Sequence, residues 1–126
     1  MNKTIIFFII FISNNILSLL EIEILKGSDN LLKIAFVPFG VNENIQEDYG
    51  NEISEFIKNN MLLFGEFDNL SKEQMLSYPS SEEDFYYRDW KIQKVDFTVI
   101  GKIHSINALG NLNISYSLFN INRRIK

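Results

Sequence analysis

The stretch Lys33-Ile34-Ala35-Phe36-Val37-Pro38-Phe39 decides the fold class of this 126-residue chain. It belongs to an apolar run, residues 31–37, that only Lys33 interrupts, and such a run is typical of a strand covered on both faces. Pro38 is expected to end the strand because proline has no N–H to donate to a ladder. A strand of this kind predicts a sheet with helices packed against it.

An amphipathic helix is predicted after this strand and a polar loop, Gly40 to Asn44. Apolar residues then recur every three or four positions over residues 45–64, which indicates one helix of about five turns. Asn42 or Asn44 is expected to cap its start, and Gly65 to end it. The residues expected on its buried face are Ile45, Tyr49, Ile53, Phe56, Ile57, Met61 and Phe64.

The rest of the chain predicts one more helix and three more strands. Residues 67–70 fit a short edge strand, and a helical turn is expected at residues 71–74. A second helix is predicted to begin at residues 81–84 and to run through Phe85, Tyr86 and Trp90. Residues 95–106 and 112–118 read as two strands joined by a hairpin loop at residues 107–111. The order predicts an α/β fold, a mixed β-sheet packed by two helices.

The first eighteen residues have the pattern of a secretory signal peptide. Met1-Asn2-Lys3 is a short positive segment, and the uncharged apolar segment that follows covers residues 4–12. A membrane anchor is the alternative, but residues 13–15, Ser-Asn-Asn, interrupt the apolar run, whereas a spanning helix needs about 20 apolar residues. We therefore expect cleavage after Ser18, a signal peptide at residues 1–18, and one exported domain at residues 19–126.

The segment that would follow cleavage alternates apolar and charged side chains. Its residues are Leu19, Leu20, Glu21, Ile22, Glu23, Ile24, Leu25 and Lys26. Alternation with a period of two is typical of a half-exposed strand. The sequence thus predicts a strand at the new amino terminus.

Charge and composition exclude several classes of function. The formal net charge of −4 argues against nucleic acid as a partner. The chain has no cysteine, so it has neither a disulfide nor a thiol ligand or nucleophile. We expect no metal ion, no cofactor and no small-molecule substrate.

Candidate catalytic residues are few. His104 is the only histidine, and as a lone histidine in a predicted strand it is expected to be structural or on the surface. The carboxylate pairs Asp84 with Asp89, or Glu82 with Glu83, fit helix starts better than acid–base catalysis.

Known catalytic and phosphate-binding motifs are also missing. The serines lack a G-x-S-x-G context, and the isolated glycines, each expected to end or bend an element, form no phosphate loop. The aromatic cluster at residues 85–90 could stack on a ligand, but its helical spacing favours core packing. The sequence therefore predicts a binding module and not an enzyme.

Five short motifs follow one another in a characteristic order. They are Leu20-Glu21-Ile22-Glu23-Ile24, Lys33-Ile34-Ala35-Phe36-Val37-Pro38-Phe39, Asn60-Met61-Leu62-Leu63-Phe64-Gly65-Glu66-Phe67, Trp90 with Phe97-Thr98-Val99-Ile100-Gly101-Lys102-Ile103, and Tyr116-Ser117-Leu118-Phe119-Asn120. In this order they resemble the amino-terminal domain of the TolB family, over residues 19–121. The resemblance implies a periplasmic protein of the Tol-Pal envelope system.

The resemblance also implies a partner and a binding segment. In the family the mature amino terminus binds the carboxy-terminal domain of TolA, which supports outer-membrane integrity and cell division. Here that segment is residues 19–26. The alternative is that this strand pairs only within its own sheet. Two other functions stay open: a different envelope-assembly binding module of the same domain type, and a small secreted hydrolase.

Family members also carry a carboxy-terminal β-propeller that binds the lipoprotein Pal. The sequence ends at Lys126 and has no repeat of propeller-blade length. We therefore expect no Pal binding, and an interrupted reading frame would account for this end.

Overall fold

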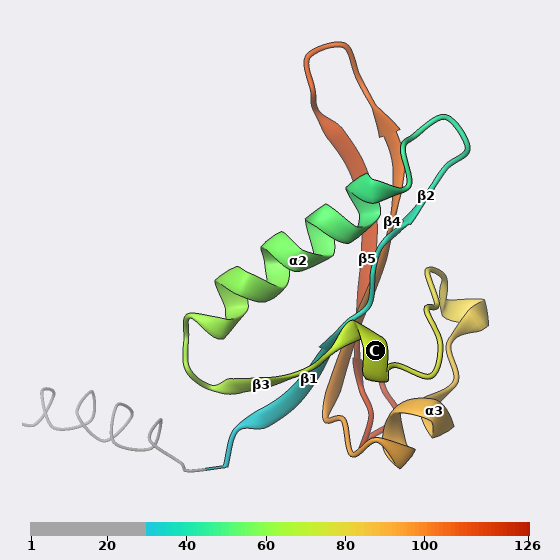
Figure 1. The fold of residues 1–126 in the computed structure, drawn as a ribbon. Coiled ribbons are helices and arrows are strands. Elements are labelled where there is room, and N and C mark those ends of the chain that lie inside the picture. Colours follow the sequence, from blue (N-terminus) through green and yellow to red (C-terminus); the bar gives the residue numbers. More distant parts are fainter. Residues whose placement is uncertain (1–29) are drawn as a thin grey trace, which may run out of the picture. The chain divides into compact units, whose positions relative to one another are not determined.

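The computed structural model of this chain describes residues 30–126. The signal peptide predicted at residues 1–18 and the strand predicted at residues 19–26 both lie outside these residues. The strands are β1 (Leu32–Phe36), β2 (Gly40–Val41), β3 (Phe67–Leu70), β4 (Phe97–Ile106) and β5 (Leu112–Asn120); the α-helices are α2 (Asp48–Leu62) and α3 (Tyr87–Ile92); the 3₁₀ turns are η1 (Lys72–Gln74) and η2 (Glu82–Asp84). The α/β class with a mixed sheet and two helices is confirmed (Figure 1).

β4 lies at the centre of the sheet. Its first half pairs in parallel with β1 and its second half with β2, while β5 pairs antiparallel with it along the other side. β3 pairs in parallel with the far side of β1, and so it is the edge strand that the sequence predicts. Pro38 separates β1 from β2, and β2 is a strand where the sequence predicts a loop.

One face of the sheet carries the main core, which is rich in aromatic residues. Phe85 stacks on Phe119 with ring centroids 3.8 Å apart and on Trp90 at 6.0 Å, and the Trp90 side chain is fully buried. Ala35, Val37 and Ile100 supply the aliphatic floor of this cluster from β1, its extension and β4. The core-packing interpretation of the aromatic cluster is therefore confirmed for Phe85 and Trp90, whereas Tyr86 is exposed.

The second helix is shorter than predicted. The chain makes the η2 turn, becomes extended at Phe85 and Tyr86, and only then forms α3. The extended break brings Phe85 against Phe119 of β5, a contact between residues far apart in the sequence that the local pattern does not encode. The prediction of one continuous helix from residue 81 through Trp90 is wrong for this reason.

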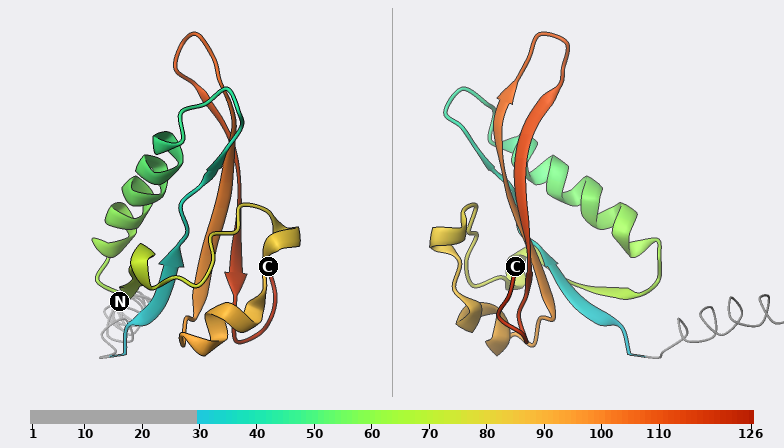
Figure 2. Two further views of the ribbon diagram at one scale, coloured as in Figure 1. Left: turned by 45° about the vertical axis from the view of Figure 1, so that its right-hand side comes forward. Right: turned by 180° about the vertical axis from the view of Figure 1, so that it is seen from behind.

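The first helix, α2, covers part of the opposite face (Figure 2). It begins at Asp48, three residues later than predicted, and its start makes no side-chain capping hydrogen bond. The expected cap Asn42 instead donates from Nδ2 to the backbone oxygen of His104, at 2.9 Å. The predicted end is close to the observed one, since Leu62 is the last helical residue and Gly65 has a left-handed φ of 70°.

The buried side of α2 is made of smaller residues than predicted. Gly50 and Ser54 are its buried residues, whereas Phe56, expected on the buried side, is 68% exposed. Small residues allow the helix backbone to approach the chain between β1 and β2, and the Phe39 N–H donates to the Gly50 carbonyl at 3.1 Å. A wider apolar face would hold the helix away from the sheet.

Two glycines leave room for Phe39. A Cβ on Gly50 would lie 1.8 Å from the Phe39 carbonyl oxygen, and a Cβ on Gly101 would lie 2.5 Å from the Phe39 ring. Both glycines lie inside elements, so the prediction that they end or bend elements is wrong. Each is needed for a close contact between the sheet and its neighbours.

The substitution Gly50→Ala should destabilise the protein, although alanine normally favours a helix. The added methyl group collides with backbone, which cannot rotate away, and we expect a loss of about 2 kcal/mol or more in the free energy of unfolding. Urea unfolding followed by the fluorescence of Trp90 measures this loss. Asn51→Ala, on the exposed side of the same helix, should change stability by less than about 0.5 kcal/mol. Equal stabilities of the two variants would contradict the close contact at Phe39.

Candidate functional site

The binding segment predicted from the sequence, residues 19–26, lies outside the described residues, and its role stays a prediction. Within residues 30–126 the most distinctive surface feature is an apolar groove on the face of the sheet that α2 covers in part. Its volume is about 640 Å³. We call it the apolar groove; its lining residues are Leu32, Ile34, Phe36, Phe39, Ile57, Met61, Phe67, Phe97, Val99, Ile114, Tyr116 and Leu118.

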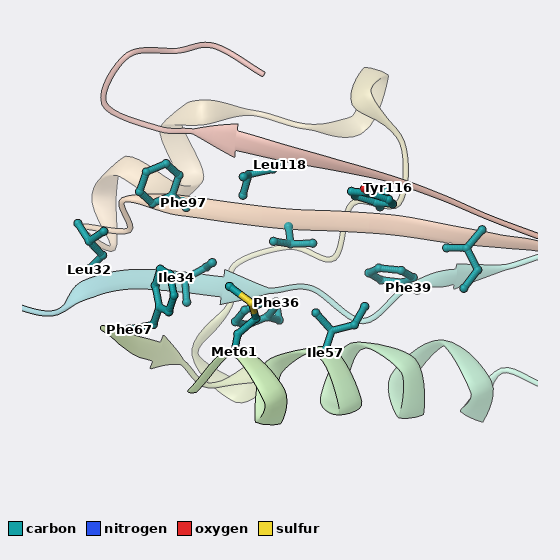
Figure 3. Close-up of a pocket in the computed structure, with 12 residues that line it drawn as sticks. Leu32, Ile34, Phe36, Phe39, Ile57, Met61, Phe67, Phe97, Tyr116 and Leu118 are labelled. Atoms are coloured by element: carbon teal, nitrogen blue, oxygen red, sulfur yellow. The ribbon is translucent and has the colours of Figure 1, made fainter. Parts of the chain in front are cut away.

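The groove has one wall of helix and a floor of sheet (Figure 3). Ile57 and Met61 line it from α2, while alternate residues of β1, β4 and β5 form the floor. Alternation along each strand puts these side chains on one face and the residues of the aromatic core on the other. Tyr116 is 74% exposed and Leu118 is 47% exposed, so the β5 side of the groove is open to solvent.

The sequence predicts the pattern in β5 but not its surroundings. Leu112, Ile114, Tyr116 and Leu118 alternate with polar residues as expected and share the face of the groove. The buried residue of β5 is Phe119, which points to the other face. Periodicity shows that two faces differ in polarity, and it carries no information on whether a neighbouring element covers the apolar one.

A small polar depression lies at the opposite face of the β4–β5 hairpin and has a volume of about 430 Å³. His104 lies here on the surface, and its Nε2 is 2.7 Å from Ser115 Oγ. The hairpin brings these two residues together across its strands. Among the residues that the structure describes, no carboxylate is hydrogen bonded to the His104 ring, so the pair lacks the acid of a catalytic triad.

Two of the carboxylates considered for catalysis, Glu82 and Asp84, have ordinary partners. Glu82 accepts hydrogen bonds from Lys126 Nζ and from Ser117 Oγ. The bond from Lys126 is the main cause that lowers the pKa of the Glu82 carboxyl, and the bond from Ser117 acts in the same direction. Asp84 accepts a bond from Ser81 Oγ at 2.9 Å at the start of the η2 turn. Each of these hydrogen bonds links a carboxylate to an ammonium or a hydroxyl group, and none of them brings two carboxylates together.

Neither a metal-binding cluster nor a membrane-spanning helix is found within residues 30–126. No group of three or more histidine, aspartate or glutamate side chains there is placed to hold a metal ion. No helix in this part of the chain has the length and apolar character needed to cross a membrane.

These features define a mixed α/β domain with an aromatic core on one face of its sheet and an apolar groove on the other. The family model of the TolB amino-terminal domain matches residues 20–126. The chain therefore belongs to the TolB amino-terminal domain family, as the resemblance implies.

Full-length relatives give the same result. The chain is 38% identical over 104 residues to the Tol-Pal system protein TolB of Marinomonas sp. (strain MWYL1), a match of 81% of this chain and 23% of the relative. It is 33% identical over 98 residues to the protein of that name from Pseudomonas aeruginosa, a match of 76% of this chain and 21% of the relative. The chain thus spans less than a quarter of the length of these relatives.

A solved structure supports the fold. TolB from Acinetobacter baumannii aligns with 77% of this chain and with 21% of its own, at a TM-score of 0.58 and 20% sequence identity. At this identity the likeness bears on the fold alone, and it agrees with the mixed sheet and the two helices.

The two faces of β5 should respond differently to truncation. Phe119→Ala removes a ring stacked in the aromatic core and should cost about 3–5 kcal/mol of unfolding free energy. Tyr116→Ala removes a ring that is mostly exposed in the groove and should cost about 1 kcal/mol or less. Urea unfolding of both variants tests this difference. A larger loss for Tyr116→Ala would show that the groove is covered in solution.

Proposed function

We propose that this chain is a periplasmic, non-enzymatic binding component of the Tol-Pal envelope system. The observation that carries the proposal is the family match over residues 20–126, together with relatives named as Tol-Pal system protein TolB. A leader of the secretory type at residues 1–18 agrees with export to the periplasm. The role includes support of outer-membrane integrity and cell division.

The proposed partner is the carboxy-terminal domain of TolA, and the proposed contact is the segment of residues 19–26. An alternating segment at a free amino terminus suits addition to the edge of a partner's sheet. In that mode the backbone supplies the affinity and alternate side chains supply the specificity. The strand pattern of Glu21, Ile22, Glu23 and Ile24 is the sequence feature in favour.

The proposal concerns the amino-terminal domain, because the family match extends over residues 20–126. The family resemblance assigns Pal binding to the carboxy-terminal propeller, so Pal is not part of the proposal for these residues. The absence of an acid beside the His104–Ser115 pair, within the described residues, also gives a hydrolase no support.

Deletion of residues 19–26 should abolish binding to the TolA carboxy-terminal domain, measured by isothermal titration calorimetry. Ile24→Pro should weaken binding strongly because it removes a backbone N–H from the proposed strand, whereas Ile24→Val keeps that N–H and should bind nearly as well as the wild type. Unfolding curves of all three variants serve as the control for folding.

Equal affinity of the deletion variant and the wild type would exclude this segment as the contact. Affinity purification of the tagged chain from periplasm tests the system as a whole. Recovery of other envelope proteins without any Tol protein would favour the alternative binding module.

Export should remove the leader. In a Gram-negative host that expresses the full chain, the intact mass of the periplasmic protein should correspond to a start at Leu19, because residues 4–12 suit a signal and are too short to span a bilayer. Mass spectrometry of the periplasmic and membrane fractions measures this. A product in the membrane fraction that still begins at Met1 would show an anchor instead.

A further inference from the structure

We draw no further inference here: the strongest candidate, the apolar groove between α2 and the β5 side of the sheet, is an unpartnered apolar face, and nothing in the structure shows what covers it.

Discussion

The backbone ladder of β4 is the interaction on which the rest of this fold depends. β4 is the longest strand of the described residues, and it pairs with β1, β2 and β5. Pro38 interrupts the chain between β1 and β2, so these two short strands are held in line only because both pair with β4. Gly101 in this strand also leaves the space that the Phe39 ring fills. Changes in β4 therefore affect both faces of the sheet.

The two faces of the sheet are covered unequally, and the cause is local. On one face, Phe85, Trp90 and Phe119 stack into a core that the loops and α3 close. On the other face, α2 is attached by its start, where the Gly50 carbonyl accepts a bond from Phe39. A single helix held there covers the β1 side of the sheet. It leaves the apolar residues of β5 open, and this produces the groove.

Much of the fold follows from local patterns in the sequence. The apolar run before Pro38 predicts β1, the alternation after residue 111 predicts β5, and Gly65 marks the end of α2 within a few residues. Each of these signals acts over a few positions. The errors arise where distant contacts decide the structure: β2 exists because β4 lies beside it, and the helix predicted from residue 81 breaks because Phe85 packs on Phe119. The buried side of α2 is set by its fit against Phe39, which favours Gly50 and Ser54 over the larger apolar residues.

The surfaces that bear on function were predictable to different degrees. The binding role of residues 19–26 stays a prediction: the strand pattern comes from the sequence alone, and the binding role from the resemblance to the TolB family. The apolar groove could not be predicted from the sequence pattern, because it depends on the position of α2 relative to β5. Alternation places Tyr116 and Leu118 on the face of the groove, but the position of α2 depends on the close contact between Gly50 and Phe39, which no local pattern encodes.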